Sequence, residues 1–166
     1  MNRLGRIFKH SFFPHLRVRR AFPPSALHAI ETAIGEAEAH HEGELRFCLE
    51  AALPIELLMR RVTPRARAID VFSLLRVWDT EHNSGVLIYL SFSDRAVEIV
   101  ADRGIHAKSG TPVWERICRT MEKEFRQGRF EAGAVAGVRA IAEELAQHFP
   151  GSGAKVNELP NRPVVL

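Results

Sequence analysis

Residues 83–101 read Asn-Ser-Gly-Val-Leu-Ile-Tyr-Leu-Ser-Phe-Ser-Asp-Arg-Ala-Val-Glu-Ile-Val-Ala, and this stretch decides the fold. Residues 86–92 are almost continuously apolar, which is typical of a central strand covered on both faces. Ser93-Asp94-Arg95 is a short turn, and apolar residues then alternate from Val97 to Ala101, which indicates a second strand. The stretch therefore predicts a buried strand joined by a hairpin to an antiparallel partner.

The segments around this hairpin predict one more strand and several helices. Apolar and polar residues alternate over 45–51, as in a strand, and Thr63-Pro64 has the sequence of an N-cap and first turn of a helix running to about Val77. A helix between two strands of one sheet makes them parallel. Apolar spacing of three and four predicts the other helices, which follow Pro24, begin at Thr111 and span 131–149. We therefore expect an α/β fold, a mixed β-sheet sandwiched between helices in three α/β/α layers, with two parallel strands plus an antiparallel hairpin strand.

Composition indicates one folded domain with an uneven charge. The 166 residues are 46% hydrophobic and 26% charged, close to the averages of globular domains. Residues 1–20 hold six basic and no acidic residues, whereas the rest of the chain holds 17 basic against 20 acidic residues. Because the body is mildly acidic, we expect no nucleic-acid partner. We divide the chain into a basic amphipathic N-terminal arm (1–22), a single α/β/α domain (23–149) and an extended C-terminal tail (150–166).

The arm carries an apolar stripe. Leu4, Ile7, Phe8 and Phe12 follow helical spacing, with basic residues on the other faces. One hypothesis is a peripheral membrane contact through residues 1–20, strengthened by attraction to anionic lipid. The alternative, which we favour, is an arm that packs its phenylalanines on the body of the protein. With no run of 18 apolar residues and no secretory signal, we expect a cytoplasmic protein whose two cysteines, Cys48 and Cys118, are reduced and buried.

Polar side chains gather at one edge of the expected sheet, where the parallel strands begin and the antiparallel strand ends. The loop before the central strand supplies oxygen donors at alternate positions, Asp79, Glu81 and Asn83, and Asp102 follows the hairpin. Such oxygens suit a hard cation, so these four residues predict a site for Ca²⁺ or another divalent cation. The alternative is a solvated loop whose side chains bond to the local backbone. The chain has no glycine-rich phosphate loop, so we expect no nucleotide cofactor.

Three ordered motifs carry a family resemblance. They are residues 83–88 (Asn-Ser-Gly-Val-Leu-Ile), 95–99 (Arg-Ala-Val-Glu-Ile) and 125–133 (Phe-Arg-Gln-Gly-Arg-Phe-Glu-Ala-Gly). Over about residues 44–149 the chain resembles the TPM-domain family, whose members include a thylakoid lumen acid phosphatase, a photosystem II repair protein and an acetylcholine-receptor modulator. The resemblance implies a mixed sheet between helices, divalent-cation binding as in several members, and phosphate-ester hydrolysis as in some.

Two departures from the family pattern bear on function. Where many members have an aspartate at the start of a helix, this chain has Ser109-Gly110-Thr111-Pro112, which argues against hydrolysis. It also shows neither the signal peptide nor the C-terminal membrane helix of many members. The resemblance then implies a variant that works beside a membrane-anchored relative or another protein partner.

Two functional hypotheses follow. The first is a binding or accessory module with a divalent-cation site at Asp79, Glu81, Asn83 and Asp102. The second is a metal-assisted phosphate-ester hydrolase, in which Arg103 stabilises developing charge and His82 or His106 transfers a proton. Open α/β sheets usually bind ligands beyond the carboxyl ends of their strands. An alternative site at that opposite edge comprises Glu50, the loop 54–57 and Asp94, although it is poorer in ligand-type residues.

Overall fold

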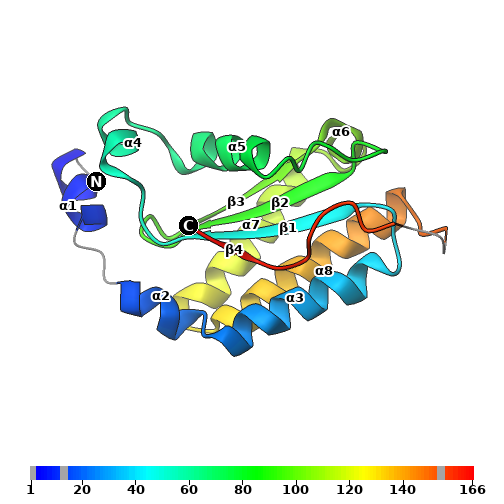
Figure 1. Cartoon of the computed structure of the whole chain (residues 1–166), viewed down its shortest axis with the longest axis horizontal. Helices are drawn as coiled ribbons and strands as arrows, with labels where there is room; N and C mark the ends of the chain where they lie inside the picture. The colour runs from blue at the N-terminus through cyan, green and yellow to red at the C-terminus, as the bar shows by residue number, and fades with distance from the viewer. Residues whose placement is uncertain (1–2, 12–14, 153–155) are drawn as a thin grey trace.

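The computed structural model describes residues 3–11, 15–152 and 156–166, and it contains a sheet with helices on both faces (Figure 1). The elements in chain order are α1 (Arg3–Ser11), α2 (His15–Ala21), α3 (Pro24–Glu38), β1 (Glu44–Glu50), α4 (Ile55–Met59), α5 (Pro64–Leu74), β2 (Gly85–Ser91), β3 (Ala96–Ala101), α6 (Arg103–Ser109), α7 (Thr111–Arg126), α8 (Phe130–His148) and β4 (Val164–Val165).

The sheet has the strand order β3-β2-β1-β4. β1 pairs with β2 in parallel along its whole length, from Glu44 opposite Gly85 to Glu50 opposite Ser91. β2 pairs with β3 in the antiparallel sense. These pairings confirm the predicted mixed sheet. β4 adds a two-residue parallel edge beside β1, so part of the C-terminal tail joins the sheet.

Both faces of the sheet are covered because both faces of its central strands are apolar. Leu45, Phe47 and Leu49 of β1 belong to a core cluster shared with α3, α7 and α8 on one side of the sheet (Figure 1). On the other face, Cys48 and Leu87 pack beneath α5. All seven residues of β1 and all seven of β2 are buried. The expected three-layer α/β/α arrangement is confirmed.

Helices α7 and α8 approach each other closely because α8 presents glycines to α7. A β-carbon on Gly133 would lie 2.7 Å from Cβ of Glu124, and one on Gly137 would overlap the side chain of Met121. Gly128, with φ of 77°, makes the tight link between the two helices. This contact fixes the position of the α7–α8 link.

The N-terminal arm folds as two helices. Val18 of α2 and Phe22 just after it are 5% and 3% exposed and belong to the core. Two polar side chains, Arg6 and His10, anchor α1 to the body. Phe8 is 66% exposed, so the structure does not bury it as the arm-packing hypothesis expects. The phenylalanines at 12 and 13 lie outside the described residues.

The two cysteines are unpaired, as expected, with Cys48 buried and Cys118 half-buried. Burial raises the pKa of each thiol to about 12. Both therefore stay protonated near neutral pH and are poor nucleophiles. None of the described helices is long and apolar enough to cross a membrane.

Candidate functional site

The loop before β2 and the start of α6 meet at the edge where the parallel strands begin. The backbone oxygen of Asn83, a residue with φ of 52°, accepts hydrogen bonds from the amides of Gly104 (3.0 Å) and Ile105 (3.3 Å). Arg103 Nε donates to Asn83 Oδ1 at 3.1 Å. Asp102 caps α6, because its Oδ1 accepts the Arg103 amide at 2.7 Å. The structure thus brings together three of the predicted site residues, Asn83, Asp102 and Arg103.

The other predicted site residues make separate contacts at this edge of the sheet. The amide of Asp79 donates to Arg76 in a turn, and the amide of Glu81 donates to the carboxylate of Glu158 at 3.1 Å. Both Asp79 and Glu81 are exposed. His82 stacks on the ring of Phe149, with 6.4 Å between ring centroids.

The second histidine, His106, is exposed on α6, where its amide donates to the backbone of Asp102. In the described part of the chain, no three His, Cys, Asp or Glu side chains are grouped as metal ligands would be. One carboxylate oxygen of Asp102, Oδ2, is buried and has no hydrogen-bond partner among the described residues. The neighbouring guanidinium of Arg103 is positively charged, which opposes a cation at the same place.

At the opposite edge, where β1 and β2 end, the carboxylate of Asp94 receives several donors. Arg6 reaches it from α1 with Nε at 3.0 Å and Nη2 at 2.8 Å, and Nη1 of Arg6 donates to the backbone oxygen of Val62. His10 Nε2 lies 3.0 Å from Asp94 Oδ1. Burial alone would raise the pKa of Asp94, but the hydrogen bonds from Arg6 and His10 lower it to about 2.

His10 is a fixed link in this cluster. The amide of Leu53 donates to its Nδ1 at 2.9 Å, so the ring proton lies on Nε2 and points at Asp94. The His10 side chain has no exposed surface. The first helix is therefore held at the carboxyl edge of the sheet by one arginine and one buried histidine.

A second buried carboxylate, Glu50, lies at the end of β1. Arg67 of α5 binds it through Nε (3.0 Å to Oε2) and Nη2 (2.8 Å to Oε1), and the hydroxyl of Tyr89 donates to Oε2. The hydrogen bond to Glu50 raises the pKa of Arg67, and burial first, then the contact with Glu50, raises that of Tyr89. Glu50 and Asp94 both lie at the alternative edge, as the topology predicts, but both are already bound by arginines, which fits structural roles.

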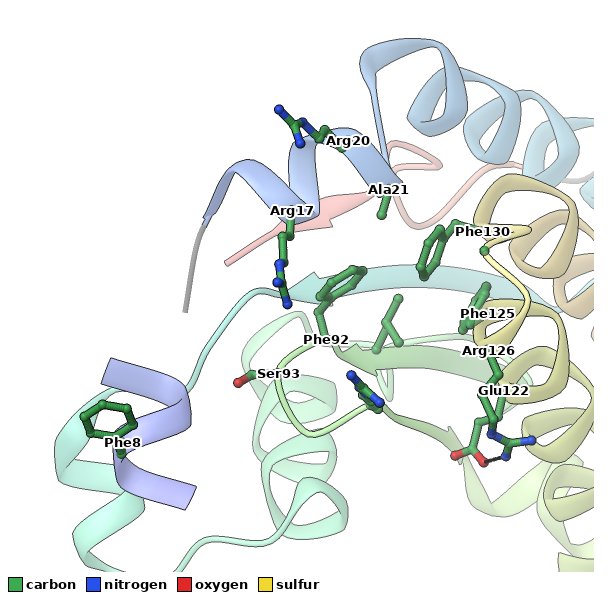
Figure 2. A pocket seen from close by; sticks show the side chains of 13 residues that line it. Phe8, Arg17, Arg20, Ala21, Phe92, Ser93, Glu122, Phe125, Arg126 and Phe130 are labelled. Atoms are coloured by element: carbon green, nitrogen blue, oxygen red, sulfur yellow. Dashed lines mark hydrogen bonds and ion pairs between the residues drawn. The ribbon is translucent and has the colours of Figure 1, made fainter. Parts of the chain in front are cut away.

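Beside the Asp94 cluster lies an open cavity of about 850 Å³, which no run of ligand-type residues in the sequence indicates (Figure 2). Four elements supply its walls: α1, α2, the end of β2 with its turn, and the α7–α8 link. Its lining residues are Phe8, Arg17, Arg20, Ala21, Leu90, Phe92, Ser93, Arg95, Glu122, Phe125, Arg126, Gly128 and Phe130. The cavity thus occupies the edge at which open α/β sheets usually bind ligands.

Phenylalanine rings form the inner wall of the cavity. The ring of Phe130 lies 5.5 Å from that of Phe92 and 5.6 Å from that of Phe125, measured between centroids. Buried Phe22 packs behind all three, with centroid distances of 5.6–6.3 Å. Ser93 has a fully buried hydroxyl with no hydrogen-bond partner among the described residues.

The charge of the lining is strongly positive, with four arginines against one glutamate. Glu122 is paired with Arg126 at 3.1 Å. Among the described residues, Arg17, Arg20 and Arg95 have no carboxylate partner. Figure 2 shows Arg17 reaching from α2 toward Phe92, while Arg20 points away from the phenylalanine rings.

A mixed sheet between two helical layers, with its polar clusters at the two ends of the strands, defines the chain as a three-layer α/β/α domain. It belongs to the TPM domain family, which matches residues 19–144. Among solved structures it is similar to the NMR structure of the BA42 protein from the psychrophilic bacterium Bizionia argentinensis. The two are 32% identical, the match covers 86% of this chain and 93% of that chain, and the TM-score is 0.73. No curated protein matches the chain.

Two of the motifs that carried the family resemblance converge on the cavity. Arg95 belongs to the motif at residues 95–99, and Phe125, Arg126, Gly128 and Phe130 belong to the motif at residues 125–133. These motif arginines and phenylalanines are the signal from which sequence reasoning could have found the site.

Proposed function

We propose that this TPM-domain chain is a binding module whose ligand is an anion with an apolar body, held in the cavity at the carboxyl edge of the sheet. The observation that carries the proposal is the combination of four lining arginines with a wall of phenylalanine rings. A guanidinium presents a rigid fork of donors that fits phosphate and carboxylate groups. Aromatic rings offer an apolar surface to the remainder of the ligand.

The size and position of the cavity support the same proposal. Small-molecule sites span roughly 300–1,000 Å³ and are mostly apolar with a few polar groups. The volume of about 850 Å³ falls within that range. The walls of the cavity combine aromatic and aliphatic side chains with arginines, as an anion with an apolar body requires.

Binding fits the lining better than hydrolysis does. General acid–base work needs a titratable side chain near the reacting atoms. The described lining contains no histidine, aspartate or cysteine, and its one glutamate, Glu122, is paired with Arg126.

The test uses anilinonaphthalene sulfonate, a fluorescent aromatic anion. We expect saturable one-to-one binding to the native protein, weakened about tenfold or more in the double variant Arg17→Gln/Arg126→Gln, because a hydrogen bond to a charged group is worth roughly 1.5–3 kcal/mol. The matched control is Arg119→Gln/Arg139→Gln, two exposed arginines of α7 and α8 that lie outside the lining. Near-ultraviolet circular dichroism of buried Trp114 verifies that each variant is folded. Equal affinity in both double variants contradicts the proposal.

A second candidate function is divalent-cation binding at the opposite edge. The buried oxygen of Asp102 that has no partner among the described residues favours it. The same place is where a metal-assisted hydrolase would act, with Arg103 beside the substrate and His82 or His106 as proton carriers. Thermal-shift titration of chelator-treated protein with Ca²⁺, Mg²⁺, Mn²⁺ and Zn²⁺ tests this, because binding to the native state raises the melting temperature. A saturable rise that is lost in Asp102→Asn supports a cation site, and no rise with any of the four contradicts it.

A further inference from the structure

The rim of the cavity exposes large apolar side chains among its arginines. Phe8 of α1 lines the cavity and is 66% exposed, and Leu16 of α2 is also 66% exposed. Helical geometry of 100° per residue places Leu16 opposite Val18, the residue through which α2 enters the core. Leu16 therefore lies on the outermost face of α2.

The same helical geometry surrounds Leu16 with positive charge. Arg19 and Arg20 flank it on the outer face of α2, and all three arginines of α2, at 17, 19 and 20, are exposed. With Arg95 and Arg126 across the cavity, this rim carries five arginines, and Glu122 is the one acidic residue in the cavity lining.

We propose that this rim is a docking surface for an anionic lipid membrane, with the phosphate of a lipid headgroup entering the cavity and Phe8 and Leu16 lying in the interfacial region of the bilayer. The inference rests on the proposed function and names the source of the anion. An interfacial surface of this kind combines apolar side chains with surrounding cations, and each cation near an anionic membrane adds attraction. A dissolved anion would use the arginines of the cavity but would leave Leu16, which is outside the lining, without a role.

The anchoring of α1 gives this surface a defined shape. Arg6 and His10 hold α1 on Asp94, whose pKa is lowered to about 2, so the ion pair between Arg6 and Asp94 persists at physiological pH. Phe8 lies between these two anchors in the same helix. The position of Phe8 at the cavity is therefore set before the protein meets a membrane, which lowers the entropy cost of binding.

The experiment is flotation of the full chain with vesicles of neutral phosphatidylcholine, or of the same lipid with about a third phosphatidylserine. We expect recovery with the anionic vesicles, falling as salt is raised, and little with neutral ones. Arg17→Gln/Arg20→Gln should weaken binding about 25-fold, at about fivefold for each cation near the surface. Leu16→Ser should weaken it about tenfold while leaving anilinonaphthalene sulfonate binding unchanged, because it removes only apolar burial. The control for Leu16 is Leu74→Ser, since Leu74 on α5 is also 66% exposed and lies across the sheet.

The outcomes separate this inference from the proposed function. If the protein binds the sulfonate but does not float with anionic vesicles, the membrane-docking inference is wrong and the proposed binding function is retained. Failure of both overturns both. The docking surface is overturned if Leu16→Ser and Leu74→Ser weaken flotation equally. It is also overturned if the charge control Arg119→Gln/Arg139→Gln weakens flotation as much as Arg17→Gln/Arg20→Gln does, because general charge attraction then explains the binding. If the protein binds soluble polyglutamate as tightly as it binds vesicles, and Leu16→Ser does not change that affinity, the partner is an acidic protein. This result also overturns the membrane-docking surface.

Discussion

Replacing Asp94 with Asn should loosen the N-terminal helix by an amount that the structure specifies. The carboxylate holds Arg6 and His10, its side chain is only 8% exposed, and its pKa is lowered from 3.8 to about 2. A shift of this size corresponds to about 2 kcal/mol of stabilisation, at 1.36 kcal/mol for each pKa unit. Because the pKa is lowered by folding, the stabilisation is complete above pH 3.8 and is lost as the pH falls from 3.8 through about 2.

The amide of Leu53 is a local reporter of this anchor, since it donates to Nδ1 of His10. Two kcal/mol corresponds to about thirtyfold in the opening equilibrium, so hydrogen exchange at Leu53 should be about thirtyfold faster in Asp94→Asn than in the parent at pH 6. The difference should shrink when the measurement is repeated, with intrinsic rates corrected, between pH 4 and 2.5. The control variant Asp70→Asn removes an exposed carboxylate of α5 and should leave Leu53 unchanged. Equal protection of Leu53 in Asp94→Asn and the parent at pH 6, or a difference that does not depend on pH, would refute the reasoning.

Three further predictions concern the core. Gly137→Val should destabilise the fold by roughly 1–3 kcal/mol in urea denaturation, because the added carbons overlap Met121; an unchanged midpoint contradicts the close approach of α7 and α8. Tyr89 is the sole tyrosine, and its pKa is raised by burial and Glu50, so the folded protein should show no phenolate absorbance at pH 10–11, and stability should fall above the unfolded pKa of about 10. Phenolate absorbance in the still-folded protein there would count against that prediction. Buried Cys48, whose pKa is raised to about 12, should react with a thiol reagent at pH 8 only at the rate of unfolding, and half-buried Cys118 should react more slowly than an exposed thiol. Rapid labelling of either thiol in the native protein would contradict this prediction.

The sheet could be predicted from the sequence because its signals are local. The apolar run 86–92, the turn at Ser93-Asp94-Arg95 and the cap at Thr63-Pro64 each specify their element within a few residues. The short helices α4 and α6 could not, since five and seven residues do not complete two turns of an apolar period. β4 is a two-residue strand whose pairing with β1 depends on the rest of the sheet being present.

The buried ion clusters escaped prediction for a different reason. Arg6 and Asp94 are 88 residues apart in the chain, and His10 and Leu53 are 43 apart. Nothing in the local sequence distinguishes Arg6 from the other basic residues of the arm. Sequence reasoning placed Glu50 and Asp94 at the correct edge through topology alone, but their partners follow only from the packed structure.

The two edges of the sheet differ in how their polar groups are used, and this difference bears on where a ligand binds. At the edge where β1 and β2 begin, several polar residues are already hydrogen-bonded within the protein: Asp102 caps its own helix, and Asn83 bonds to the first turn of α6. Residues that complete local turns are committed before any ligand arrives. At the edge where β1 and β2 end, arginines from α2, from the turn after β2 and from the end of α7 line one cavity. Three of these arginines have no carboxylate partner among the described residues. Like charges brought together from distant segments repel one another, and an anion that binds among them relieves that repulsion. The density of ligand-type residues in the sequence therefore indicated the edge where β1 and β2 begin. We expect the ligand at the opposite edge, where the positive charge of the arginines is not neutralised.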